Sequence, residues 1–213
     1  MFNLLYKELR LAAHPTLYVF MLMGALIIIP SYPYSVVFLF GCLAPFITFL
    51  FGRETRDTYY TALLPVRKSD VVKGKFLMIV FVQLGELLFS IPFALLRTHL
   101  FTERNQVGLE ANVAYYGFGF LCFALFNLIF LTQFYQTAYK AGKAFILAMI
   151  PVSVVMVGME GLSHVPSLQW LDGVEPHMLR LQLPILIAGI FLYLFATIGA
   201  YHLATGYFDK VDL

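Results

Sequence analysis

The chain has 213 residues, of which 61% are hydrophobic and 12% are charged, with a formal net charge of +2 and a mean hydropathy of +0.82. Soluble domains carry about 25% charged residues, so half that share excludes an ordinary soluble domain. Apolar runs close to the roughly 20 residues that cross a bilayer indicate instead an all-α membrane protein.

The first predicted element is an amphipathic helix over residues 1–15. Asn3, Lys7, Arg10 and His14 recur at helical spacing and share one face, and Pro15 separates the helix from the apolar run that follows. Such a helix is typical of the membrane interface, where its basic residues face anionic headgroups and membrane lipid is its partner. The alternative is a plain basic anchor ahead of the first span.

Six apolar runs follow, and each predicts one membrane span. The predicted spans are Thr16–Ile29, Tyr34–Phe51, Lys75–Leu96, Val113–Phe134, Ala144–Met159 and Leu183–Leu203. Of the 14 Lys and Arg residues, this arrangement leaves only Arg97, Arg104 and Arg180 on the outer side. Under the positive-inside rule, that distribution places both termini in the cytoplasm and makes residues 1–213 one six-span domain.

Between the second and third spans lies a charged cytoplasmic loop, residues 52–74, with a short apolar run inside it. Tyr59 and Leu63 are one helical turn apart, as are Tyr60 and Leu64, so they form the apolar face of a short helix that Pro65 ends. The positive-inside rule alone explains the basic residues but leaves this apolar face in water. The pattern therefore favours a helix that docks on a soluble partner.

The third span carries a polar stripe formed by Gln83, Glu86 and Ser90, which Arg97 continues toward the end of the span. Glu86 lies midway along the span, where a charge costs roughly 2.5–3.5 kcal/mol, so we expect its carboxyl group to be protonated, paired or facing water. Asn127 of the fourth span is its candidate partner at similar depth. Two roles are open for Gln83, Glu86, Ser90 and Asn127. They line a translocation path, or they hold the bundle together through hydrogen bonds between helices.

The outer segment 160–184, between the fifth and sixth spans, is half apolar. It predicts one or two short helices that dip back into the outer interface with Trp170 as an anchor, and an ordered surface loop is the alternative. In the sixth span, Ala196, Ala200 and Ala204 recur at four-residue spacing, which is typical of close packing between helices.

The sequence carries no recognisable motif for a metal, a nucleotide or catalysis. Cys42 and Cys122 fall inside predicted spans and the histidines are scattered, so no metal site is expected. A phosphate-binding loop requires G-x-x-x-x-G-K-[ST], whereas Gly142-Lys143 is followed by Ala144. We therefore expect a chain that is not an enzyme, holds no cofactor of its own and binds no nucleic acid.

Several short segments carry a family resemblance. They are Lys7-Glu8-Leu9-Arg10 before the first span, Glu54 after the second, the run from Tyr60 to Lys68, and Val71-Val72-Lys73-Gly74-Lys75 at the third. With these segments the chain resembles the membrane subunit of ABC-2 type transporters, and is similar to the compact bacterial permeases of phenol-soluble modulin export and lantibiotic immunity.

The resemblance implies an interfacial elbow helix with Lys7, Glu8 and Arg10, re-entrant outer helices, and a coupling helix seated in a cleft of a separate ABC ATPase. The residues implied in that coupling are Glu54, Arg56, Asp57, Tyr59, Tyr60, Leu63, Leu64 and Pro65, with the Tyr and Leu side chains as a wedge and the charged ones at its edge. Two ATPase copies, which bind ATP and Mg, and a second permease, identical or paralogous, would complete a transporter in the bacterial cell membrane.

The implied function is ATP-driven export of a hydrophobic or amphipathic substrate, such as a peptide or a lipid-like molecule. One alternative is a proton-coupled secondary carrier with Glu86 as the proton site, which leaves the docking helix unexplained. Another is an intramembrane enzyme with Glu86 as acid or base, which lacks a second catalytic group at a defined spacing.

Overall fold

The computed structural model describes residues 2–63, 65–101, 105–137 and 140–210, without the side chains of Phe2, Thr58, Tyr59 and Ala62. Within these ranges all regular structure is helical, which confirms the all-α class. The elements are α1 Phe2–Lys7, η1 Glu8–Ala12, α2 Thr16–Met21, η2 Leu22–Ile28, α3 Ser35–Glu54, α4 Asp57–Ala62, α5 Lys68–Leu100, α6 Val113–Phe126, η3 Asn127–Leu131, α7 Thr132–Gln136, α8 Ala141–Leu162, η4 Pro166–Leu171 and α9 Pro176–Asp209.

Within the described residues, five helices are long and apolar enough to cross a membrane. They are α3, α5, the continuous helix Val113–Gln136 formed by α6, η3 and α7, and then α8 and α9. A sixth span results if the bent pair Asn3–Ala12 and Thr16–Ile28 counts as one. The spans follow the predicted apolar runs in order, and the helices α5 and α9 are longer than the predicted spans because each helix extends beyond its apolar part.

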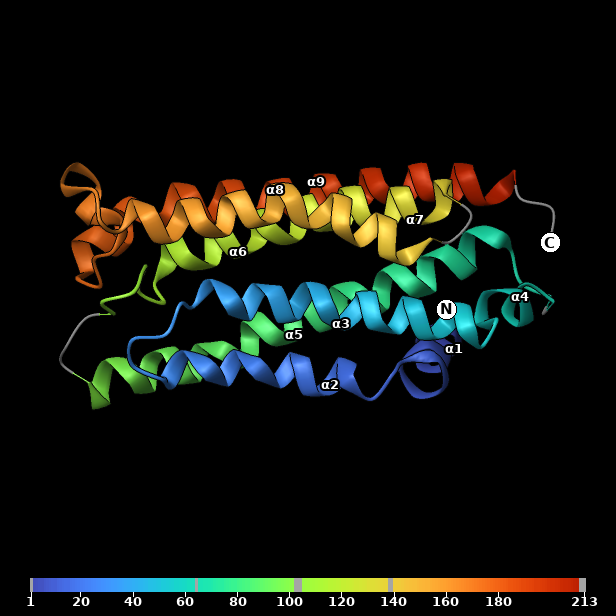
Figure 1. Ribbon diagram of the computed structural model, residues 1–213, viewed down its shortest axis with the longest axis horizontal. Helices are drawn as coiled ribbons and strands as arrows, with labels where there is room; N and C mark the ends of the chain where they lie inside the picture. Colours follow the sequence, from blue (N-terminus) through green and yellow to red (C-terminus); the bar gives the residue numbers. More distant parts are fainter. Residues whose placement is uncertain (1, 64, 102–104, 138–139, 211–213) are drawn as a thin grey trace.

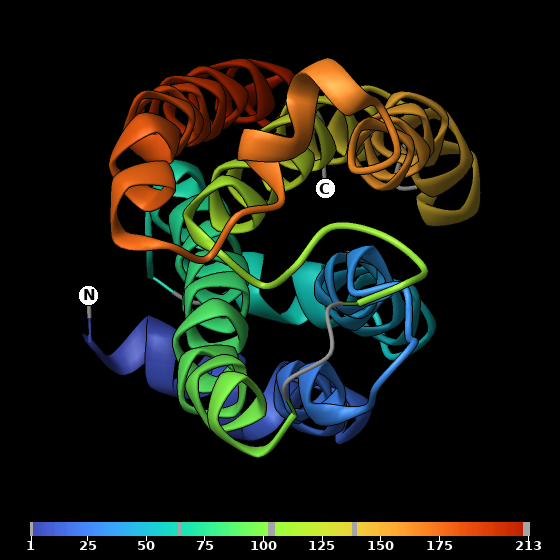
Figure 2. The same ribbon diagram turned by 90° about the vertical axis from the view of Figure 1, so that its left-hand side faces the viewer.

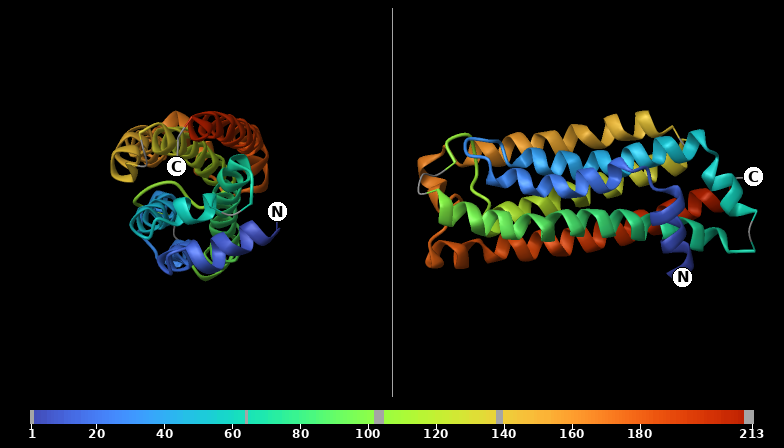
Figure 3. Two further views of the ribbon diagram at one scale, coloured as in Figure 1. Left: turned by 90° about the vertical axis from the view of Figure 1, so that its right-hand side faces the viewer. Right: turned by 90° about the horizontal axis from the view of Figure 1, so that it is seen from below.

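The N-terminal helix, formed by α1 and η1, lies across the bundle, at 100° to the helix that follows it (Figure 3). The chain turns at Ala13, whose backbone is extended, and α2 begins directly after Pro15, where the sequence predicts a break. η2 is a 3-10 helix, which rises about 2 Å per residue against about 1.5 Å for an α-helix. The short first span is thereby stretched to about 23 Å, which is still shorter than the roughly 30 Å of a bilayer core.

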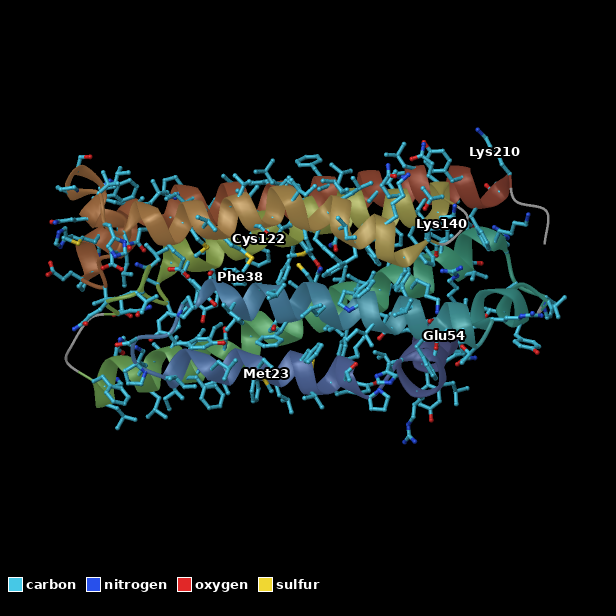
Figure 4. All side chains as sticks on the ribbon, in the orientation of Figure 1. Met23, Phe38, Glu54, Cys122, Lys140 and Lys210 are labelled. Atoms are coloured by element: carbon cyan, nitrogen blue, oxygen red, sulfur yellow. The ribbon has the colours of Figure 1, made fainter. Side chains whose placement is uncertain are left out.

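The spans run side by side as a bundle with chemically different ends (Figure 1). α1, α4 and the last turn of α9 lie at one end, where the labelled Glu54, Lys140 and Lys210 are also found (Figure 4). We call this the basic end. η4 and the first turn of α9 lie at the opposite end. The N-terminal helix and the end of α9 thus lie at the same end of the bundle, which agrees with an even number of crossings.

Seen along its axis, the bundle has two sides (Figure 2). α6, α8 and α9 gather on one side, and α2, α3 and α5 on the other. The two sides meet where α5 packs on α9 and where α3 packs on α6 and α8.

Glycines of α6 and α9 allow a close approach between these two helices. A Cβ atom added to Gly189 would lie 2.3 Å from the carbonyl oxygen of Gly117, so the two backbones touch directly. Ala200 and Ala204 of the predicted small-residue stripe are buried further along α9. Small residues allow such contact in a membrane, where no hydrophobic effect drives helices together.

The segment 160–184 consists of the last turn of α8, the short helix η4 and the start of α9. Two buried side chains fasten η4 to the bundle. The Gln182 amide donates to the carbonyl oxygens of Trp170, Leu171 and Gly173 at 2.8–3.2 Å, and the Asn112 amide donates to those of Leu171 and Gly173 at 2.7 and 3.2 Å. Gln182 Oε1 accepts the backbone N–H of Ala114, in the first turn of α6, at 3.1 Å. The segment therefore closes over the opposite end of the bundle.

Candidate functional site

α4 presents its apolar residues to the surface of the basic end. The chain reaches it from α3 through a sharp turn in which Arg56 adopts a left-handed backbone conformation, with φ of 54°. Tyr60 is 62% exposed and the adjoining Leu63 is 67% exposed. Glu54, Arg56 and Pro65 are also exposed around them. Leu64 and the Tyr59 side chain, which complete the predicted wedge, lie outside the described residues.

Asp57 differs from the other charged residues of this loop because it points into the protein. Its two carboxylate oxygens lie 2.5 Å from Lys7 Nζ and 2.5 Å from Lys75 Nζ. The same two lysines contact Glu8, at 3.0 Å for Lys7 and 2.6 Å for Lys75. Each lysine therefore bridges both carboxylates, and the four residues form a closed ion-pair ring.

The ion-pair ring, Lys7, Glu8, Asp57 and Lys75, is largely shielded from water. Glu8 and Lys75 are buried, and Lys7 and Asp57 are mostly covered. The ring sums to zero charge, which is the condition under which buried charges are tolerated. Lys7 also donates to the Thr61 hydroxyl at 2.7 Å. The ring thus joins the N-terminal helix, α4 and the first turns of α5.

This arrangement corrects the predicted role of Lys7. The sequence groups Lys7 with Arg10 on a face turned toward lipid headgroups, whereas the structure turns Lys7 toward Asp57 and leaves Arg10 exposed, 5.8 Å from the Tyr6 ring. The reason is local: the helix widens to a π-helix at Glu8–Ala12, which shifts the register of every later residue.

The ring supplies a prediction about pH. Burial alone raises the pKa of Asp57, but the charge of Lys75 and the hydrogen bonds from Lys7 and Lys75 outweigh it and hold the pKa below the ordinary 3.8. A carboxyl group whose pKa is lowered in the folded protein stabilises the fold at any pH above the pKa that it has in the unfolded chain. This stabilisation is lost as the pH falls through the pKa of the folded protein. We therefore expect the difference in melting temperature between wild type and Asp57→Asn to be constant near neutral pH and to shrink below about pH 3.8.

Thermal unfolding in detergent over a pH series measures that difference. Asp70→Asn, which removes one carboxylate from the first turn of α5, is the matched control. A difference for Asp57→Asn that stays constant down to the lowest pH would contradict the ion-pair assignment.

Deep in the bundle, Gln83 and Asn127 form a paired hydrogen bond. Each side-chain amide donates to the other's oxygen, at 2.8 and 2.9 Å. Tyr193 donates to the Gln83 oxygen at 3.0 Å, and Asn127 also donates to Thr197 at 3.1 Å. The cluster joins α5, η3 and α9, so the partner of Asn127 is Gln83, where Glu86 was expected.

Glu86 lies apart from this cluster and is fully buried. Neither of its carboxyl oxygens has a hydrogen-bond partner among the described residues. The carboxyl group sits against α3 and α6, since a Cβ atom on Gly41 would lie 2.1 Å from Oε2 and 2.5 Å from the Phe123 ring. Ser90 turns elsewhere, to the Leu87 carbonyl and the Tyr116 hydroxyl. Gln83, Glu86 and Ser90 of the predicted stripe thus lie in three separate environments.

The opposite end contains polar contacts between distant residues that sequence reasoning missed. Arg97 pairs with Glu110 at 3.2 Å, and Glu110 also accepts the backbone N–H of Asn105. Glu160 of α8 accepts the backbone N–H groups of Ser35 and Leu109, both at 2.9 Å, and thereby caps α3. The signal available in the sequence was carboxylates next to apolar spans, which are rarely left unpaired.

Cys42 and Cys122 are free thiols buried among apolar side chains. No group of three or more His, Cys, Asp or Glu residues in the described part of the chain could hold a metal ion.

Comparison with known proteins gives one result. A family model described as ABC-2 family transporter protein matches residues 3–205. No curated protein and no solved structure matches the chain.

Proposed function

Because this chain belongs to the family of ABC-2 transporter proteins, and so is a membrane permease component, we propose that it couples to a separate ATPase and drives export. The observation that carries this proposal is α4: a short helix between two spans that exposes Tyr60 and Leu63 to water at the basic end. Large exposed apolar side chains in a charged loop are typical of a docking surface. ATP and Mg would be held by the partner chain.

We further propose that two permease copies, identical or paralogous, assemble with two ATPase subunits in the bacterial cell membrane. The interior of one bundle is filled around the buried Glu86 and the Gln83–Asn127 pair. A route for a large substrate is therefore better accommodated between two bundles than within one.

The proposed substrate is hydrophobic or amphipathic, such as a peptide or a lipid-like molecule. Two adjoining grooves, of about 400 and 310 Å³, lie between α5, α6 and the first half of α9. Ile91, Val113 and Tyr116 line both, and the larger groove is almost entirely apolar. Such grooves suit molecules that partition into the membrane.

Isolation of the tagged protein from native membranes tests the proposal. We expect an ABC ATPase to co-purify in stoichiometric amount with wild type and to be lost with Tyr60→Asp/Leu63→Asp, because charges replace the apolar contact. Val107→Asp/Val174→Asp, which changes two exposed valines at the opposite end, is the control and should retain the ATPase. Wild type without an ATPase, under conditions that keep such complexes intact, would overturn the proposal.

A proton-coupled secondary carrier is the second candidate, favoured by one observation: the buried Glu86 carboxyl without a partner among the described residues. Transport in proteoliposomes distinguishes the two. Dependence on a proton gradient without ATP would favour the carrier, and dependence on ATP with the co-purified ATPase would exclude it.

A further inference from the structure

The ion-pair ring connects elements that lie far apart in the sequence. Lys7 and Asp57 are separated by 50 residues, and Lys75 approaches the same carboxylate from the base of α5. Besides the ion pairs, the N-terminal helix and α5 are in van der Waals contact, since a Cβ atom on Gly74 would lie 3.4 Å from Glu8 Cγ. The N-terminal helix therefore packs directly beside α4 and the base of α5.

α4 depends on such contacts for its position. It has six residues, and isolated helices of that length are not stable in water. Its residues Asp57 and Thr61 both contact Lys7, while the side chain of Tyr60 is 62% exposed. Ion pairs and a hydrogen bond thus hold the inner face of α4, and its outer face is exposed.

We infer that Lys7, Glu8 and Lys75 are positioning residues for α4, so that the N-terminal helix, α4 and the base of α5 move as one body. The inference rests on the proposed function of α4 as the docking helix. It assigns the N-terminal helix a task beyond membrane attachment: it supports the docking surface from the inner side of α4.

Charge balance gives the inference a specific signature. Loss of one member leaves the ring with an uncompensated buried charge, whereas loss of Glu8 and Lys75 together leaves the neutral Lys7–Asp57 pair. A ring that positions α4 should therefore respond more strongly to Glu8→Gln or Lys75→Met alone than to the two combined. A purely local packing role would make the combined change the worst of the three.

Distances between spin labels test the position of α4 in the full-length permease alone. Nitroxides at Tyr6→Cys and Tyr60→Cys, both exposed, report on the N-terminal helix and α4, in a Cys42→Ala/Cys122→Ala background reconstituted in lipid nanodiscs. We expect a narrow distribution with the ring intact, a broad one in Glu8→Gln and in Lys75→Met, and a narrow one again in the double variant. Lys73→Met, which removes the same charge from a neighbouring position of α5, is the control and should stay narrow.

Co-purification of the ATPase with unlabelled variants provides the functional readout. We expect the retained ATPase to fall by about tenfold in each single variant and to recover in the double variant, because the ring positions the docking face without touching the partner. Single variants that keep both the narrow distribution and the ATPase would overturn the inference.

The two measurements separate the inference from the proposed function. If no ATPase co-purifies with wild type, the proposed function fails, while the spin-label distances still decide whether the ring positions α4.

Discussion

Replacing Arg97 with methionine should lower the free energy of unfolding by about 3–5 kcal/mol, because Glu110 would be left as a buried and uncompensated charge. The pair is 3.2 Å apart, and both side chains are almost fully shielded from water. Arg97 also lies 5.6 Å above the ring of Tyr34, so its loss removes packing as well as charge. Denaturation in mixed detergent micelles measures the effect.

The matched experiment removes both charges. Glu110→Gln combined with Arg97→Met should recover part of the loss, since the amide oxygen still accepts the N–H of Asn105 without carrying a charge. A cost below about 1 kcal/mol for Arg97→Met would match an exposed pair and contradict the buried geometry.

Placing lysine at Glu86 should prevent the protein from accumulating in the membrane, whereas glutamine at the same position should be tolerated. Glu86 is fully buried with no hydrogen-bond partner in the described part of the chain, so the neutral acid is the form that fits. Lysine introduces a charge that costs at least roughly 2.5–3.5 kcal/mol at the bilayer centre. The longer lysine side chain also would not fit, because the Glu86 carboxyl group already packs directly against Gly41.

Infrared difference spectroscopy of wild type against Glu86→Gln identifies the protonation state directly. We expect the C=O stretching band of a neutral carboxylic acid in wild type, and its loss in the variant. A carboxylate signal at neutral pH would contradict the assignment and would require a cation or water beside Glu86.

The order of the spans follows from sequence because it depends on local composition. Long apolar runs and the position of Pro15 are properties of neighbouring residues, and both appear in the structure where predicted. The ends of the helices were harder to predict. α5 starts at Lys68, ahead of the apolar run, because nothing in its charged first turns prevents the helix from continuing. Leu64, at the end of the predicted wedge, is outside the described residues.

The polar contacts were not predictable because they join residues distant in the chain. Spacing within the third span places Gln83 and Glu86 on one face, yet only Gln83 meets Asn127. Two π-helical segments add to the difference between the predicted and the observed contacts. One begins at Glu8 and the other at Asn127, and each rotates the side chains that follow it around the helix axis. A strict helical period in the sequence cannot anticipate either shift.

The length of α5 has a mechanical consequence. Its 33 residues make a rod about 50 Å long, well beyond the roughly 30 Å of the hydrocarbon core. Lys75 is fixed near one end and Arg97 near the other, with Glu86 midway between them. A tilt of roughly 5° about Glu86 would move Lys75 and Arg97, each about 16 Å from it, by about 1.4 Å. That is enough to break the Arg97–Glu110 contact, so a small push at the basic end would act as a lever on the far side of the membrane.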